Sequence, residues 1–402
     1  MENGRGGIMT DLIQECEELY GEIVSLRRTI HANPDLGMEC TRTVRCISDY
    51  LTREEIPFTI TEHGGVVAKI SGTKGASDQI VLLRSDMDAL PLKEDTGLEF
   101  SSTDPERMHA CGHDLHTAIM LGSAKLLKRH RGEFAGKVHL LFQPGEEISE
   151  GARCMIQDGV MEGVSMAYAL HMDPFAPVGT IRVKEGPDWA AVDRFTITIH
   201  GKSSHGAMPH KGADATVAGA AVLQAIQTIV SRASDPVCPL VITVGSFHSG
   251  TTWNIISDKA ELKGTCRSFD KEVYDQLPEL LERVVTEVPK GFGCTGELHL
   301  ERTTPPLIND PEVCRLVRTS AANVIGEEHV LQAKQEMIGE DFACFEQFAP
   351  VCFVHLGGGA EYPLHSSHVV FGEESIKTGM AVETQFAIDA LNALNAGSGS
   401  PE

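Results

Sequence analysis

Short, largely apolar runs alternate with helical stretches in the first part of this chain, and polar residues follow each run directly. Runs of this kind occupy residues 80–83, 138–142 and 166–170. The first leads into Arg84-Ser85-Asp86-Met87-Asp88, and the third ends at His171. A run of this length and composition is typical of a strand buried on both faces of a sheet. With helices expected at 10–32 and 114–130, the pattern predicts an α/β layer whose strand ends carry the chemistry.

The pattern changes after Gly186-Pro187, where polar and apolar residues begin to alternate. Alternation with a period of two is typical of strands in an antiparallel sheet with one covered face. It predicts strands at residues 194–200, 241–247, 261–269 and 297–302. Two helical stretches fit between them, near 212–232 and 271–288. We therefore expect a separate α+β domain that is inserted into the first.

The α/β pattern returns from Pro305, with a strand at 351–356, a glycine run at 357–359 and a helix near 373–395. The expected division is a catalytic domain in two parts, residues 10–186 and 305–396, around an inserted domain at 187–304. The polar tail at 397–402 is expected to be disordered.

Bulk composition excludes several classes of function. The chain of 402 residues carries a formal net charge of −23, so a nucleic-acid partner is not expected. No apolar stretch approaches the roughly 20 residues that span a bilayer, and residues 1–10 lack the apolar core of a signal peptide. The 11 cysteines are scattered singly, which favours reduced thiols. We expect a cytoplasmic protein without a membrane partner.

The hexapeptide Cys111-Gly112-His113-Asp114-Leu115-His116 concentrates a thiol, two imidazoles and a carboxylate. Further candidate ligands follow other strand-like runs, namely Glu146-Glu147, His171 and His365. Cysteine, histidine and carboxylate side chains that converge on one point suit a divalent transition metal. In an adjacent glutamate pair, one carboxylate can bind metal while the other takes a proton from water. These residues predict a metal-dependent hydrolase.

Each of these features also has a structural explanation. A single cysteine or histidine in an apolar segment is usually a core residue. His113 and His116 could cap a helix or face solvent, and His171 could simply end a buried strand. Glu146 and Glu147 could be favourable charges at a helix N-terminus. The combination favours the metal site over these separate explanations.

Eight stretches carry a family resemblance that runs in order over residues 10–395. They are residues 27–37, 84–91, 108–114, 143–147, 171–174, 201–206, 339–342 and 364–366. The chain resembles the dinuclear metallopeptidases that include hippurate hydrolase, indole-acetyl-amino-acid hydrolases and aminoacylase-like carboxypeptidases. The resemblance implies a mixed-sheet catalytic domain sandwiched by helices. The inserted α+β domain, with four antiparallel strands and two helices, would then be a lid and dimerisation domain.

The resemblance also implies a cofactor and a set of site residues. Two divalent metal ions per subunit are expected, with zinc or manganese favoured and cobalt or nickel as alternatives. The implied ligands are Cys111, His113, Glu147, His171 and His365. Glu146 would be the general base. Asp88 would lie behind a ligand and accept a hydrogen bond that fixes the ligand's orientation.

In the inserted domain, the resemblance implies that His205 enters the active site of a partner subunit and stabilises the oxyanion. Asn254 and Arg267 match positions near the substrate, where a guanidinium can hold the α-carboxylate. A solvent-facing turn explains His205 equally well, and a charge at a strand edge explains Arg267. We expect the glycines at 357–359 to permit a close backbone approach near the acyl or amino-acid pocket.

The implied activity is hydrolysis of the amide bond of an N-acyl amino acid by a cytoplasmic homodimer. Hippurate-like, N-acetyl and indole-acetyl amino acids are the expected substrates. Dipeptides, aminobenzoyl-glutamate and carbamoyl amino acids are alternatives for the same site. A catalytically silent binding protein with the same fold, and a hydrolase that uses Cys111 as its nucleophile, are alternatives of other classes.

Overall fold

The computed structural model describes residues 6–397. In the tail at 397–402, which was expected to be disordered, Gly397 is helical and the other five residues lie outside the described part. Residues 1–5 of the N-terminal segment 1–10, which was predicted not to be a signal peptide, also lie outside it. The chain divides into two compact units. Unit 1 comprises Met1–Gly186, Ile308–Lys334 and Cys344–Glu402, and unit 2 comprises Pro187–Leu307 and Gln335–Ala343.

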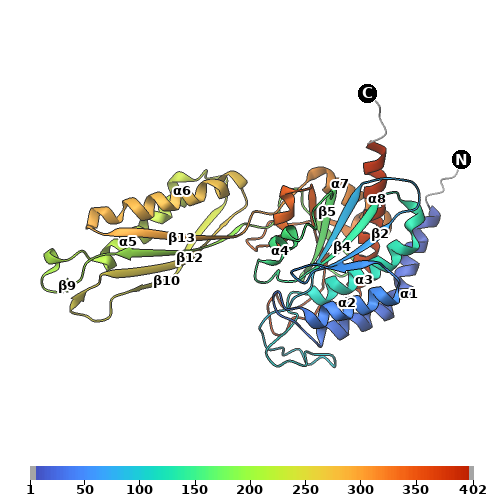
Figure 1. The fold of residues 1–402 in the computed structure, drawn as a ribbon, viewed down its shortest axis with the longest axis horizontal. Coiled ribbons are helices and arrows are strands. Elements are labelled where there is room, and N and C mark those ends of the chain that lie inside the picture. Colours follow the sequence, from blue (N-terminus) through green and yellow to red (C-terminus); the bar gives the residue numbers. More distant parts are fainter. Residues whose placement is uncertain (1–5, 398–402) are drawn as a thin grey trace. The chain divides into compact units, whose positions relative to one another are not determined.

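Unit 1 is built on a mixed sheet of eight strands, which confirms the predicted fold class (Figure 1). The strand order is β1-β2-β4-β3-β5-β16-β6-β15. The strands are β1 (Phe58–Ile60), β2 (Val66–Ser71), β3 (Ile80–Asp86), β4 (Lys137–Gln143), β5 (Met166–Asp173), β6 (Ile181–Val183), β15 (Val330–Gln332) and β16 (Val351–Gly357). The central strands β4, β3, β5 and β16 are parallel. Their carboxyl ends therefore meet at one edge of the sheet.

Helices cover this sheet and pack against one another. They are α1 (Gly6–His31), α2 (Thr41–Arg53), α3 (His113–Arg129), α4 (Gly151–Gln157), α7 (Pro311–Ile325) and α8 (Ser375–Gly397). Helix α3 lies against both α1 and α8 and is buried along most of its length. The ring of Tyr168 in β5 stacks on Phe386 of α8 with centroids 4.8 Å apart. The predicted helices at 10–32, 114–130 and 373–395 are confirmed as α1, α3 and α8.

Unit 2 contains a four-stranded antiparallel sheet in the order β10-β12-β8-β13, together with two helices. These elements are β8 (Val192–His200), β10 (Leu240–Ser249), β12 (Lys259–Ser268), β13 (Thr295–Thr304), α5 (Ala215–Thr228) and α6 (Lys271–Glu287). Alternate residues of β8 are buried, among them Ile197 and Ile199, where they pack with Val222 and Leu281 of the helices. The predicted α+β architecture is confirmed. Polar and apolar residues alternate along the strands because the helices cover only one face of the sheet.

A short two-stranded sheet lies at one tip of unit 2, where β9 (Ser204–His205) pairs with β11 (Ile255–Ile256) (Figure 1). Among residues 6–397, no helix has both the length and the apolar character required to cross a membrane.

Candidate metal centre

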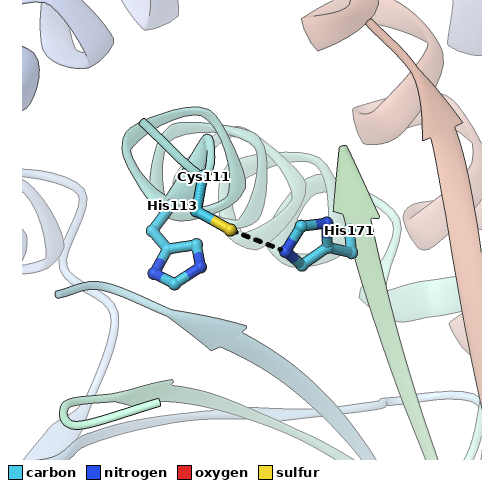
Figure 2. Close-up of side chains that lie close together, drawn as sticks. All are labelled: Cys111, His113 and His171. Atoms are coloured by element: carbon cyan, nitrogen blue, oxygen red, sulfur yellow. Dashed lines mark hydrogen bonds between the residues drawn. The ribbon is translucent and has the colours of Figure 1, made fainter. Parts of the chain in front are cut away.

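A glycine turn brings two candidate ligands to the same side of the backbone. Gly112 has φ +93°, and it immediately precedes helix α3, which begins at His113. A Cβ atom on Gly112 would lie 2.7 Å from Cγ of Met172, so no larger residue fits this position without movement of its neighbours. The turn leaves the side chains of Cys111 and His113 beside His171 of β5 (Figure 2). The Sγ atom of Cys111 lies 3.3 Å from Nε2 of His171.

His113 is held with one ring nitrogen available for a ligand. Its Nδ1 donates a hydrogen bond of 2.9 Å to the main-chain carbonyl of Asp88, which fixes the tautomer. Its buried Nε2 has no hydrogen-bond partner among the described residues. That nitrogen lies 3.7 Å from Oδ2 of Asp86, 3.9 Å from Oε1 of Glu147 and 4.0 Å from Oε2 of Glu146. A cation placed among these atoms would meet lone pairs from several directions.

Asp88 fixes the glutamate pair through its side chain. The two carboxylate oxygens accept the main-chain N–H groups of Glu146 and Glu147, each at 3.1 Å. The hydrogen bond that orients His113 instead goes to the main-chain carbonyl of Asp88. One residue at the end of β3 thus positions both the imidazole and the two acids. The carboxylate of Asp88 also lies behind this candidate ligand, with its Oδ1 3.5 Å from Nδ1 of His113.

His365 approaches the same site from a strained turn. Its φ of +62° lies in the left-handed region that non-glycine residues rarely adopt. Its N–H donates to the carbonyl of Ala110, next to Cys111. Its Nε2 lies 3.5 Å from Oε2 of Glu147. Backbone strain at a polar residue that faces other polar residues is typical of functional sites.

The candidate ligands form two overlapping groups that share one thiol. Ligand atoms of Cys111, His113 and His171 all lie within 4.8 Å of one another, and the same holds for Cys111, Glu147 and His365. The structure therefore brings together all five residues that the family resemblance implied as ligands. A sulfur atom common to two such groups can bridge two cations, because a thiolate has several lone pairs.

The electrostatics of the site also suit cations. Burial lowers the pKa of His113, but the carboxylates of Asp86, Asp88 and Glu147 together outweigh this effect and raise that pKa to about 10. Burial raises the pKa of Glu147 to about 7, and the charges of Asp88 and Asp86 add to this effect. The carboxylates of Asp86, Asp88 and Glu147 lie close together with few positive charges to offset their own. A divalent cation would supply positive charge and would satisfy the buried, unpartnered Nε2 of His113 and Oε1 of Glu147.

His116 lies beside the candidate ligands, although the sequence interpretation did not include it among the site residues. It is 1% exposed, which excludes the solvent-facing position considered as one alternative. Its Nδ1 donates to Oδ1 of Asp86 at 2.6 Å, and its Nε2 accepts the main-chain N–H of Met172 at 2.9 Å. Both ring nitrogens are thus occupied by protein atoms, and we assign His116 a supporting position behind the neighbouring His171.

Further buried charged residues lie next to the candidate ligands. Arg84 donates to Oδ2 of Asp86 at 2.7 Å and to Oε1 of Gln143 at 3.0 Å. On the other side of α3, Oδ2 of Asp114 lies 2.7 Å from both Nε of Arg27 and Nδ1 of His31. A signal for the first group was present in the sequence, because a charged Arg84 inside a buried strand requires a partner.

The three candidate residues of unit 2 do not all lie together. His205 is exposed in β9, and the carbonyl of Asn254 accepts the N–H of the adjacent Gly206 at 2.8 Å. Arg267 lies near the other end of β12, opposite Val241 of β10. At a rise of about 3.3 Å per residue, the eight residues from Lys259 to Arg267 span about 26 Å. His205 and Asn254 therefore form one group, and Arg267 stands apart from it.

Comparisons with known proteins identify the family of the chain. The model of Peptidase family M20/M25/M40 matches residues 82–389. An N-acetylcysteine deacetylase of Bacillus subtilis is 35% identical, over 93% of this chain and 98% of the relative. An IAA-amino acid hydrolase of Arabidopsis thaliana is 33% identical, over 94% of this chain and 90% of the relative.

A solved structure is similar along nearly its whole length. The YXEP protein of Bacillus subtilis, described as a dinuclear metal binding peptidase from the M20 family, superimposes with a TM-score of 0.84 at 33% identity. The match covers 94% of this chain and 99% of that protein. The resemblance inferred from eight short motifs is thus confirmed over the whole fold. The chain belongs to Peptidase family M20/M25/M40 and is a metallo-hydrolase of that family.

Proposed function

We propose that this protein cleaves the amide bond of an N-acyl amino acid with the help of two divalent metal ions. The observation that carries the proposal is the pair of ligand groups that share Cys111, with the carboxylate of Glu146 beside them. The names of the relatives, an N-acetylcysteine deacetylase and an IAA-amino acid hydrolase, support an N-acylated amino acid as the substrate class.

The first metal would be held by Cys111, His113 and His171, and the second by Cys111, Glu147 and His365. Thiolate, imidazole and carboxylate donors together suit zinc, and manganese, cobalt and nickel are the alternatives. When bound, the metals lower the pKa of a water molecule toward neutrality and polarise the scissile carbonyl.

Glu146 belongs to neither of the groups that share Cys111, and its side chain is 11% exposed. Its main-chain N–H is fixed by Asp88, which aims the side chain at the site. We assign it the general base that takes a proton from the attacking water and returns it to the departing amine. Its neighbour Glu147 is 8% exposed and would remain a ligand.

We extend the proposal to a cytoplasmic homodimer in which His205 donates a hydrogen bond to the oxyanion in the site of the other subunit. Exposed apolar side chains around His205 support a partner at this tip of unit 2. Trp253 is 93% exposed, Ile255 52% and Met208 44%. Arg267 would hold the α-carboxylate of the substrate, because a guanidinium binds a carboxylate with two parallel hydrogen bonds.

Metal analysis combined with amine release tests this function. The panel consists of N-acetyl, N-benzoyl and N-indoleacetyl derivatives of one amino acid, with a dipeptide, aminobenzoyl-glutamate and a carbamoyl amino acid as alternatives. We expect about two metals per subunit, release of amine from the acylated amino acids, and loss of activity with a chelator. A fully metal-loaded protein that releases no amine from any N-acyl amino acid would refute the proposal.

Glu146→Gln is the matched variant for the mechanism, because it removes the base while keeping the shape and all five ligands. We expect it to retain the metals and to lose nearly all turnover. Loss of metal from this variant, or activity close to that of the wild type, would contradict the assignment of Glu146.

A further inference from the structure

Two adjoining segments of unit 1 carry three exposed apolar side chains. Phe175 is 62% exposed, Tyr362 45% and Val178 37%. They come from two segments, residues 174–178 and 358–362, which follow β5 and β16 respectively. Exposed apolar side chains gathered on adjoining segments commonly mark a binding surface. We call Phe175, Val178 and Tyr362 the apolar ledge.

The two segments are fastened to each other by their backbones. The N–H groups of Gly358, Gly359 and Ala360 donate to the carbonyls of Asp173, Ala176 and Pro174, at 2.8, 2.9 and 2.6 Å. A Cβ atom on Gly357 would lie 1.9 Å from the carbonyl oxygen of Pro177, so the close backbone approach predicted for the glycine run is confirmed. The ledge therefore rests on two segments that support each other.

The side chain of Asp173 fixes the turn that presents Phe175. Its Oδ1 accepts the N–H groups of Phe175 and Ala176 at 3.0 and 3.1 Å. Its Oδ2 accepts a hydrogen bond of 2.6 Å from Arg182. A turn held in this way is preformed, so a ligand that contacts Phe175 need not order the backbone when it binds.

The ledge lies at the same edge of the sheet as the metal centre. Strands β5 and β16 are parallel, with Gly357 opposite Asp173, and both segments leave their carboxyl ends. Phe175 is four residues from His171 and Tyr362 is three residues from His365. At 3.8 Å between successive Cα atoms, the Cα atoms of these pairs lie at most about 15 and 11 Å apart. Ligands of α/β sheets bind at this edge.

We infer that the apolar ledge binds the acyl group of the substrate and selects aromatic acyl groups over acetyl. The inference rests on the proposed function, and it adds the acyl class and the residues that recognise it. The scissile carbonyl is part of the acyl group, so the aromatic substituent of a benzoyl or indoleacetyl substrate is held within one or two bonds of the reacting carbon and must lie on surface close to the metal centre. Among the described residues of these two segments, the ledge offers that group apolar contact, while an acetyl group is too short to use it.

Phe175→Ala and Tyr362→Ala test the inference, alone and combined. The assay is kcat/KM for N-acetyl, N-benzoyl and N-indoleacetyl derivatives of the same amino acid. We expect kcat/KM for the aromatic acyl substrates to fall roughly tenfold to a hundredfold in the double variant, and that for the acetyl substrate to change less than about twofold. Folding should be unaffected, because both side chains are exposed.

Ile60→Ala is the control, because Ile60 is 55% exposed on β1, the strand at the far edge of the same sheet. It should leave all three values of kcat/KM unchanged. If the ledge variants lose activity equally on acetyl and aromatic acyl substrates, or lose none, the inference is overturned while the proposed function stands. If the metal-loaded wild type hydrolyses no acylated amino acid, the proposed function fails and the inference fails with it.

Discussion

Glu383 of α8 should make the stability of unit 1 depend on pH. Its side chain is 1% exposed, and one carboxyl oxygen accepts a hydrogen bond of 2.8 Å from the hydroxyl of Ser123. Burial raises the pKa of Glu383 from 4.5 to about 8, because the Ser123 bond only partly compensates the loss of solvent. Burial also raises the pKa of the neighbouring Tyr168, and the negative charge of ionised Glu383 adds to that effect.

The sign and size of the effect follow from these two pKa values. Between pH 4.5 and about 8 the folded state keeps the Glu383 proton while the unfolded chain releases it. Stability is therefore fully present below pH 4.5 and falls as the pH rises, by about 1.4 kcal/mol for each pH unit. The loss from this group amounts to about 3 kcal/mol at pH 7 and about 4 kcal/mol at pH 8.

Glu383→Gln removes this loss because the amide cannot ionise. We expect the variant and the wild type to unfold at similar temperatures at pH 4.5. As the pH rises, the wild type should lose stability that the variant keeps, so that at pH 8 the Tm of the variant exceeds that of the wild type by several degrees. Calorimetry of the metal-free proteins measures the difference, with the exposed Glu18→Gln as a control. Parallel Tm profiles for the wild type and Glu383→Gln would refute the reasoning.

Four further predictions concern the metal centre. Cys111→Ser should lower metal affinity and turnover together, by tenfold or more, because both ligand groups lose their common sulfur; metal titration checks this, and an unchanged affinity would exclude the bridge. His205→Ala should keep its metals yet slow the chemical step roughly a hundredfold, which single-turnover kinetics would show or deny. Mixing inactive Glu146→Gln and His205→Ala subunits should restore partial activity, and no recovery would argue against action across a dimer. His116→Phe should weaken metal binding about 10–100-fold. His116→Gln should weaken it less, because the amide oxygen can still accept the Met172 N–H. Equal metal affinities for the two variants would contradict the supporting role.

Much of the fold could be predicted from the sequence because the relevant signals are local. A run such as 80–83 needs burial on both faces, and alternation such as that of 194–200 needs burial on one, whatever the rest of the chain does. The helices α2, α4 and α7 were not predicted. The candidate ligands were also recognisable, because cysteine, histidine and paired glutamates occur together after strand-like runs, and this combination favours a metal site over the separate structural explanations.

Tertiary structure alone decided how those residues are used. Nothing local distinguishes His113, whose Nε2 is left without a protein partner, from His116, whose two nitrogens are both bonded, because the partners come from β3 and β5. The sharing of Cys111 between two ligand groups likewise depends on residues 36 and 254 positions away in the chain, Glu147 and His365. The apolar ledge exists only because the segments after β5 and β16 bond to each other. Sequence patterns report which residues must be buried, whereas hydrogen-bond partners and shared ligands depend on distances between segments that only the folded backbone sets.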